Sequence, residues 1–449
     1  MNCIWITTDS FRQDHVHCYR PEGTRDDSGP RLHVQTPNLD NLATESVLFE
    51  RLRSEALPTV PCRRGYWTGR RVFPWSDEPF YKGMYIHAPG WRPLPQEDVT
   101  VAEHLSEQGF VTSLICDVYH LMKPSQNFHR GFQGYDWSRG QEFDRWKTQP
   151  LREGRIDEFL KTGARESERH SQVLVQFLKN HAFLENDEDY PSARTFRKAI
   201  DWLKQNKDHE NFYLHIETFD PHEPWLTPNR YFDIYKPDHK GPRLIYPNLY
   251  KREQLNADEH ENARANYAAN CTMTDHWIGQ LLNTVDECGL RESTLIIVVS
   301  DHGKIIGEFG HYGMPPQDTG LALNEVLLFM RHPSGEKAGT RFPGWLYSTD
   351  VTATMLSLLD VAPKPMTDGE SVWPAVRDGV DAFRNYLVTG HAQMVCTWQE
   401  DWLCLVNTEE NTACLYNLAD DPCRQDDVAD RYPSVRDDLA AKMRRVVER

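Results

Sequence analysis

The sequence lacks the features that mark membrane, secreted and repeat proteins. It has no apolar run near the roughly 20 residues that a membrane-spanning helix requires, and no internal repeat or low-complexity tract. No basic region or cleavage site precedes residues 2–8, which have the composition of a core strand, so we expect no signal peptide. The ten cysteines form no C-x-x-C pair, and we expect reduced thiols in a cytoplasmic protein without a membrane partner.

Positive charge is also scarce. The 449 residues include 50 Lys and Arg against 67 Asp and Glu, which gives a formal net charge of −17. Proteins bind nucleic-acid backbones through Lys and Arg, so we expect no nucleic-acid polymer as a partner. The length suits a large domain, which we assign to residues 1–380, and a smaller one at residues 381–449. The composition leaves open whether the protein forms a homo-oligomer.

Acidic residues follow two long apolar segments. Residues 2–8 have the pattern of a buried strand that runs into Asp9, and residues 294–300 of another that runs into Asp301 and His302. Open α/β sheets bind their ligands just beyond the carboxyl ends of parallel strands. Each pattern alone also fits a simple turn or helix cap. Together they predict two carboxylates and an imidazole at one edge of a sheet.

The segment from Thr59 to Arg70 has the pattern of a helix start. Pro61 suits a first helical turn, which would place Thr59 at the N-cap, beside free N–H groups and the positive end of the helix dipole. Arg63 would follow one turn later on the same face. An ordinary capped helix explains these residues equally well. Combined with the acidic strand ends, they predict a four-ligand site for a divalent cation. The predicted ligands are Asp9, Thr59, Asp301 and His302.

In this order the motifs resemble the sulfatase family of the alkaline phosphatase superfamily. Residues 59–70 resemble the family's C/S-x-P-S-R-x(4)-T-G-R motif, residues 220–225 its P-H-x-P-W segment, and residues 300–303 its second metal motif. Residues 415–422 resemble its C-terminal L-Y-D-L-x-x-D-P signature. The resemblance implies an α/β, alkaline-phosphatase-like fold. Such a fold has a large mixed, mostly parallel sheet sandwiched by helices, with a small C-terminal α+β subdomain.

Several positions depart from the family pattern. Thr59 stands where most members have the Cys or Ser that becomes formylglycine, so we expect no formylglycine here. Val118 and Met314 stand where the family usually has lysines that hold the substrate's oxygens, and Lys304 is a candidate to replace one of them. Ser10 replaces the second metal-binding aspartate of many members, as in the phosphonate monoester hydrolase and phosphodiesterase branch.

The resemblance implies a hydrolase that acts on a small anionic ester. Thr59 would be the nucleophile, as in the nucleotide pyrophosphatases and phosphodiesterases of the same superfamily. Arg63 would neutralise the substrate's oxygens, and His222 or His120 would donate a proton to the leaving group. We expect one divalent ion, which could be Mn, Zn, Ca or Mg. Whether a second ion binds stays open, and its candidate ligands are Glu217, Asp220 and His222.

Three functions follow as alternatives. The first is a phosphodiesterase or phosphonate monoester hydrolase, favoured by Thr59, Ser10 and the missing lysines. The second is a sulfatase that uses an unmodified threonine. The third is a catalytically dead binding protein, against which the intact set of predicted ligands argues. Two irregular segments are harder to assign: we expect residues 71–98 to wall the pocket, and residues 127–165 to form an insertion or lid.

Overall fold

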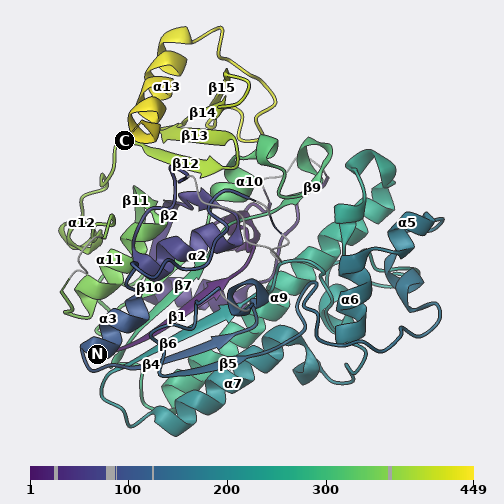
Figure 1. Cartoon of the computed structure of the whole chain (residues 1–449), viewed down its shortest axis with the longest axis horizontal. Helices are drawn as coiled ribbons and strands as arrows, with labels where there is room; N and C mark the ends of the chain where they lie inside the picture. The colour runs from purple at the N-terminus through teal and green to yellow at the C-terminus, as the bar shows by residue number, and fades with distance from the viewer. Residues whose placement is uncertain (25–28, 77–85, 87, 124–125, 363–366, 449) are drawn as a thin grey trace.

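An eight-stranded sheet forms the centre of the molecule (Figure 1). The structure is a computed structural model that describes residues 1–24, 29–76, 86, 88–123, 126–362 and 367–448. The strand order is β11-β2-β10-β7-β1-β6-β4-β5, and β10 alone runs antiparallel to its neighbours among these described strands. The strands are β1 (Asn2–Thr8), β2 (Val47–Arg53), β4 (Val111–Cys116), β5 (Gly134–Trp137), β6 (Phe212–Thr218), β7 (Thr294–Ser300), β10 (Leu328–Arg331) and β11 (Arg341–Tyr347).

Helices cover both faces of this sheet. Successive side chains of a strand point to opposite faces, and in β1 Ile4 and Ile6 belong to one core whereas Cys3 and Trp5 belong to the other. The first face is covered by α1 (Pro37–Glu45), α6 (Gln172–Asn180), α7 (Pro191–Asn206) and α9 (Ala257–Glu287). The second is covered by α2 (Thr59–Thr68), α3 (Val101–Glu107), α4 (Tyr119–Met122), α11 (Ser348–Leu358) and α12 (Trp373–Asp378). The predicted helix-sandwiched, mostly parallel sheet is confirmed.

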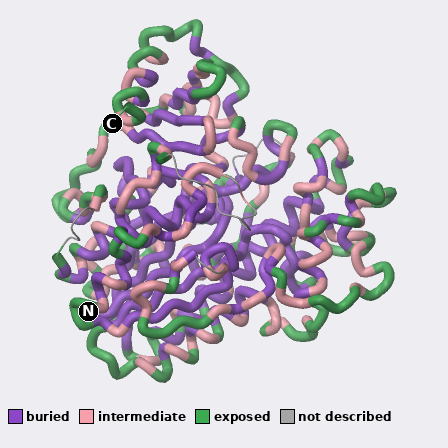
Figure 2. Tube along the Cα trace, viewed as in Figure 1, coloured by how far each residue is buried: buried purple, intermediate pink, exposed green. Residues whose placement is uncertain are grey.

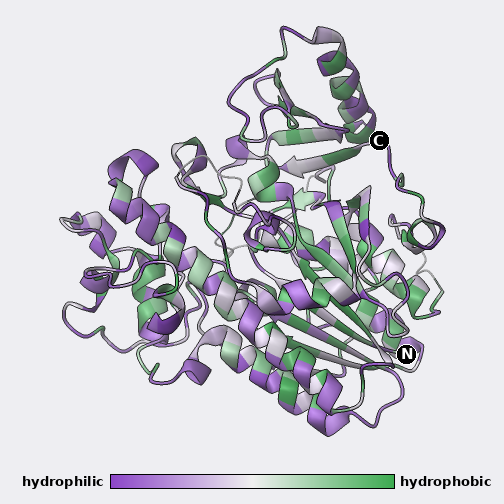
Figure 3. Ribbon diagram, turned by 180° about the vertical axis from the view of Figure 1, so that it is seen from behind, coloured by the Kyte–Doolittle hydropathy of each residue, from purple (hydrophilic) through white to green (hydrophobic). Residues whose placement is uncertain are grey.

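Burial on both faces explains the composition of the central strands. Figure 2 shows the strands of the large sheet as buried over most of their length, and Figure 3 shows long hydrophobic stretches in them. Strands covered on both faces need apolar side chains at every position, not at alternate ones. None of the helices in the described residues is both long and apolar enough to cross a membrane.

A second sheet carries the C-terminal part of the chain. Its order is β15-β14-β13-β12-β3, and the two-residue strand β3 comes from the N-terminal region, where it pairs in parallel with β12. Its elements are β3 (Ala56–Leu57), β12 (Leu387–His391), β13 (Met394–Gln399), β14 (Trp402–Asn407), β15 (Thr412–Asn417) and the packed helix α13 (Pro433–Val447). The division of the chain at residue 380 stays a prediction.

Shorter elements connect these layers. They are α5 (Glu166–Arg169), α8 (Asn229–Phe232), α10 (Leu321–Asn324), β8 (Ile305–Ile306) and β9 (Tyr312–Gly313), together with 3-10 turns. The expectation that residues 71–98 wall the pocket falls partly on residues outside the described ones.

The N-cap assignment of Thr59 was wrong by one residue. Helix α2 begins at Thr59, and Pro58 is its N-cap, whose carbonyl accepts the Cys62 N–H at 3.2 Å. Proline lacks an N–H group, so it fits the position before a helix as well as the first turn. Thr59 therefore lies inside the first helical turn, and its hydroxyl is not used as a cap.

Candidate active site

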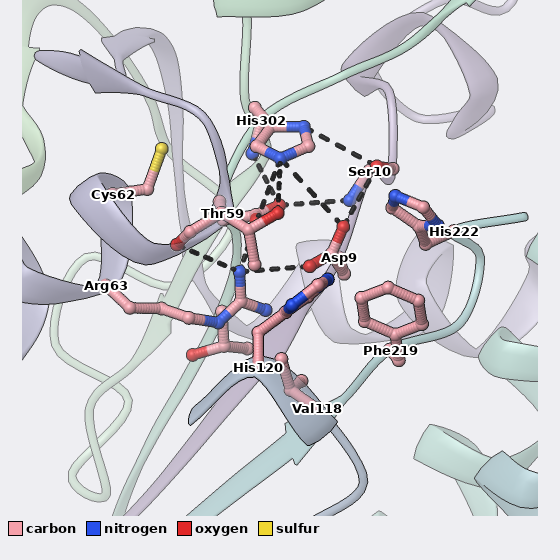
Figure 4. Close-up of polar contacts among 12 residues, drawn as sticks. Asp9, Ser10, Thr59, Cys62, Arg63, Val118, His120, Phe219, His222 and His302 are labelled. Atoms are coloured by element: carbon pink, nitrogen blue, oxygen red, sulfur yellow. Dashed lines mark hydrogen bonds and ion pairs between the residues drawn. The ribbon is translucent and has the colours of Figure 1, made fainter. Parts of the chain in front are cut away.

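Three predicted metal ligands meet at the carboxyl edge of the large sheet. β1 and β7 are parallel neighbours that pair Thr8 with Ser300, so the next residues of the two strands, Asp9 and Asp301, emerge together. One ligand atom from each of Asp9, Asp301 and His302 lies within 4.8 Å of the other two, and all three residues are buried. The two strand-end motifs thus converge in space as expected (Figure 4).

Ser10 supports this cluster. Its N–H donates to Asp301 Oδ1 at 2.9 Å and its hydroxyl donates to Asp9 Oδ1 at 2.9 Å. Ser10 has a φ of 62°, a left-handed conformation that non-glycine residues seldom adopt. Ser10 therefore orients the two carboxylates.

The donor set fits a divalent cation. His302 Nδ1 donates to the Gly303 carbonyl at 2.8 Å, so the lone pair of neutral His302 is on Nε2, which lies 3.2 Å from Asp301 Oδ2. Asp9 Oδ2 is buried without a hydrogen-bond partner among the described residues. Burial and the charge of Asp301 raise the pKa of Asp9 well above its usual range. Two carboxylates and a facing imidazole lone pair repel one another, and the single charge of Arg63 beside them balances only one carboxylate, so the set favours a further cation.

Thr59 and Arg63 approach the same cluster from α2. Thr59 Oγ1 lies 3.3 Å from His302 Nε2, and the threonine is buried. Arg63 Nη1 lies 3.0 Å from Asp9 Oδ2 and also pairs with Asp301. One turn of helix separates Thr59 from Arg63, which explains why both reach one site. Arg63 Nη2 is buried and has no hydrogen-bond partner among the described residues.

A relay of buried polar side chains from β6 holds the Arg63 guanidinium in place. Arg63 Nε donates to Glu217 Oε2 at 2.8 Å, and Glu217 Oε1 lies 2.9 Å from His215 Nε2. The Tyr213 hydroxyl lies 2.6 Å from His215 Nδ1. Glu217 is therefore the partner of Arg63, and in the described residues it does not join Asp220 or His222 in a metal-ligand group. Polar residues at alternate positions of a buried strand were the sequence signal for this relay, because they share one face.

His222 and His120 lie on the other side of the cluster (Figure 4). His222 Nδ1 lies 2.7 Å from the Glu223 carbonyl, and its ring stacks on Phe219 at 4.2 Å between centroids. Burial lowers the pKa of His222 and lowers that of His120 to about 4. Both imidazoles are therefore neutral near pH 7. The structure brings both near the site, and their roles stay predictions.

The model of the sulfatase family matches residues 1–361 of this chain. The chain belongs to the sulfatase family. It is 24% identical over 421 residues to an arylsulfatase of Clostridium perfringens, across 87% of this chain and 81% of that protein. It is 25% identical over 346 residues to iduronate 2-sulfatase of Homo sapiens, across 70% of this chain but only 56% of that protein's length.

Solved structures of sulfatase-like hydrolases share the fold. The phosphonate monoester hydrolase of Agrobacterium radiobacter superposes with a TM-score of 0.73 at 18% identity, across 99% of this chain and 95% of that one. This likeness confirms the alkaline-phosphatase-like α/β fold. Membership of the sulfatase family makes the chain a metal-dependent hydrolase of ester bonds, with Asp9, Asp301 and His302 as its candidate metal triad.

Two positions at which the sequence comparison led us to expect lysines are apolar in this chain. Val118 is fully buried in the core beneath α2, and Met314 packs against the small cluster that contains Leu57 and Cys62. Lys304, the candidate replacement, forms a buried ion pair with Glu223. The charge of Lys304 is thus balanced within the protein.

Cys62 does not take the place of the missing formylglycine precursor. Its thiol donates to the Ala56 carbonyl at 2.9 Å, and burial raises its pKa well above the usual range. Thiols react mainly as thiolates, so Cys62 is held as an unreactive core side chain. At the start of α2 it is the Thr59 hydroxyl, not the Cys62 thiol, that lies beside the candidate metal triad.

Proposed function

We propose that this sulfatase-family hydrolase cleaves phosphodiesters or phosphonate monoesters, with Thr59 as a covalent nucleophile. The observation that carries the proposal is the position of Thr59 Oγ1, 3.3 Å from His302 Nε2 at the start of α2. A hydroxyl becomes a good nucleophile when a neighbouring group lowers its pKa. The free N–H groups of the first helical turn add partial positive charge beside it.

One divalent ion would be held by Asp9, Asp301, His302 and Thr59. When bound, such an ion lowers the pKa of a ligated hydroxyl and neutralises anionic oxygens. We infer Mn, Zn, Ca or Mg, because carboxylate and imidazole ligands suit several of these. Metal analysis of the purified protein separates this proposal from a catalytically dead binding protein, which need not retain an ion.

Arg63 would bind the substrate's oxygens. Its Nε is fixed by Glu217 and its Nη1 by Asp9 and Asp301, whereas Nη2 has no partner in the described part of the site. The guanidinium is thereby oriented before substrate arrives. A donor that needs no reorganisation is effective at stabilising charge that develops in a transition state.

The charge balance favours a substrate with one negative charge. Asp9, Asp301 and Glu217 surround the single charge of Arg63, so a divalent ion would bring this cluster close to neutrality. Lys304 is neutralised by Glu223. A phosphodiester or phosphonate monoester carries one charge, whereas a phosphate monoester carries nearly two at neutral pH. Half-buried, apolar Met314 would tolerate the second organic group of such an ester, whereas Val118 is buried in the core.

A sulfatase that uses unmodified Thr59 is the second candidate. Relatives whose names end in sulfatase match most of this chain, and sulfate monoesters also carry one charge.

In the first step either His120 or His222 could protonate the leaving group only after gaining a proton itself. For His222 the free nitrogen is Nε2, because Nδ1 faces the Glu223 carbonyl.

A rate comparison tests the proposal. Purified enzyme is assayed against four nitrophenyl substrates: a sulfate, a phosphate monoester, a phosphate diester and a phosphonate monoester. We expect kcat/KM to be highest for the diester or the phosphonate. A highest value for the sulfate would support the second candidate, and a highest value for the phosphate monoester would contradict the charge argument.

A further inference from the structure

The segment after β5 carries a carboxylate back to the active site. Gln141 and Asp144 close a turn in which the Asp144 N–H donates to the Gln141 carbonyl at 2.9 Å, and Glu142 within it has a φ of 42°. Arg139 pairs with Asp144, which also accepts the Gly140 N–H at 3.0 Å. A non-glycine residue in the left-handed region persists where its surroundings hold it. This turn therefore fixes the direction in which Glu142 points.

Glu142 determines which nitrogen of His120 carries the proton. Glu142 Oε2 accepts the Tyr119 hydroxyl at 2.6 Å and lies 3.1 Å from His120 Nε2. Burial opposes the charge of Glu142, but the hydrogen bond from His120 and the positive charge that His120 gains in acid lower the pKa of Glu142 to about 2. An ionised carboxylate can only accept hydrogen bonds. The proton of neutral His120 is therefore on Nε2, and the lone pair is on Nδ1.

The other nitrogen of His120 is an unused acceptor. His120 is 3% exposed, and its Nδ1 is buried without a hydrogen-bond partner in the described part of the chain. In Figure 4 the ring of His120, a residue of the short helix α4, points toward Asp9 and Arg63. An unsatisfied buried acceptor is rare and calls for an explanation. If Nδ1 accepts a proton from a molecule in the site, that role explains why none of the described protein groups occupies it.

We propose that Glu142 is a positioning residue that holds His120 as the base for the second half of the reaction. The proposal rests on the proposed function, in which Thr59 carries the substrate's phosphorus group. The oxygen of a water bonds to phosphorus while the bond from phosphorus to Thr59 Oγ1 breaks. One water proton passes to His120 Nδ1 and then to Thr59 Oγ1, which retains the electron pair of the broken bond. Glu142 stabilises the imidazolium that forms in between.

Accumulation of the covalent intermediate tests this role. The experiment uses rapid quench with the nitrophenyl ester that wild type cleaves fastest, on Glu142→Gln and His120→Gln. Steady-state turnover should fall about 10²-fold, the usual scale of general-base catalysis. The first turnover should still release about one nitrophenolate per enzyme, because nitrophenolate is a weak base that leaves without a proton from His120. Mass spectrometry should find the phosphorus group on Thr59 in both variants.

A neighbouring variant separates positioning from structure. Asp136→Asn removes an exposed ion pair with Lys198 in β5, just ahead of this segment, and it should leave turnover unchanged and trap no group on Thr59. Wild-type turnover in Glu142→Gln, or loss of the first nitrophenolate together with turnover, would overturn the proposal. If turnover falls alike in Glu142→Gln and His120→Gln but no group is ever found on Thr59, the Thr59 nucleophile of the proposed function is refuted, and the pairing of Glu142 with His120 stands.

Discussion

The active site has two sides that differ in how their charge is arranged. At the ends of β1 and β7 three ionisable side chains lie close together, namely Asp9, Asp301 and His302. Arg63 and a metal ion are needed to balance their charge. Near the ends of β4 and β6, His120 and His222 are neutral rings among aromatic side chains. The first side fits an ion and anionic oxygens, and we propose that the second moves protons.

The largest effect should come from the metal side. Asp301→Ala removes a carboxylate that faces both Arg63 and His302, and it should remove most of the bound metal and nearly all turnover. Metal content is measured by elemental analysis of the purified variant. Asp136→Asn, which alters an exposed carboxylate in β5, should retain wild-type metal. An Asp301→Ala protein with wild-type metal content would show that our ligand set is wrong.

The nucleophile can be removed without touching either carboxylate. Thr59→Ala should fold and lose at least ~10³-fold in kcat/KM, because a covalent nucleophile has no substitute in the site. Thr59→Ser keeps the hydroxyl and should retain measurable turnover. Intact-protein mass spectrometry should show wild-type Thr59 without modification. Near-wild-type rates in Thr59→Ala would mean that water attacks the substrate directly.

A positive charge added at position 314 should weaken the preference for singly charged esters. Met314→Lys places a cation where the family usually has one, and it should shift the kcat/KM ratio toward the phosphate monoester by about tenfold, the equivalent of about 1.4 kcal/mol. Met314→Leu is the matched control, because it keeps the apolar contact with the Leu57 cluster. An unchanged ratio in the lysine variant would remove charge as the explanation of specificity.

The smallest effect concerns stability in acid. Burial, aided by the charge of Arg194, lowers the pKa of His181 to about 3, whereas an unfolded histidine titrates near 6.5. The unfolded state therefore binds more protons below pH 6.5, and stability is lost as the pH falls toward 3. His181 should account for about 1 kcal/mol of the loss between pH 7 and 5.5. Chemical unfolding of His181→Gln should show a correspondingly flatter pH dependence, and equal slopes would contradict this assignment.

The metal side could be predicted from the sequence, whereas much of the proton side could not. Parallel strands that end in acids must converge at one edge, so residues 2–9 and 294–302 identified the triad directly. The partner of Arg63 was missed because Glu217 lies 154 residues away in the sequence. Its closeness in sequence to Asp220 and His222 favoured a second set of metal ligands instead. Glu142 was missed because the irregular segment 127–165 has no periodicity that fixes a side-chain direction.

The short strand β3 makes the C-terminal sheet part of the catalytic machinery's assembly. Ala56 and Leu57 pair with Gly390 and His391 of β12, and α2 begins two residues after Leu57. During synthesis on the ribosome, the triad's strands and α2 emerge long before β12 exists. Strand β3, which directly precedes α2 and Thr59, therefore gains its last backbone partners only when the chain has been translated past residue 391. A message truncated before that codon would encode every proposed catalytic side chain and still lack the frame that holds the nucleophile in place.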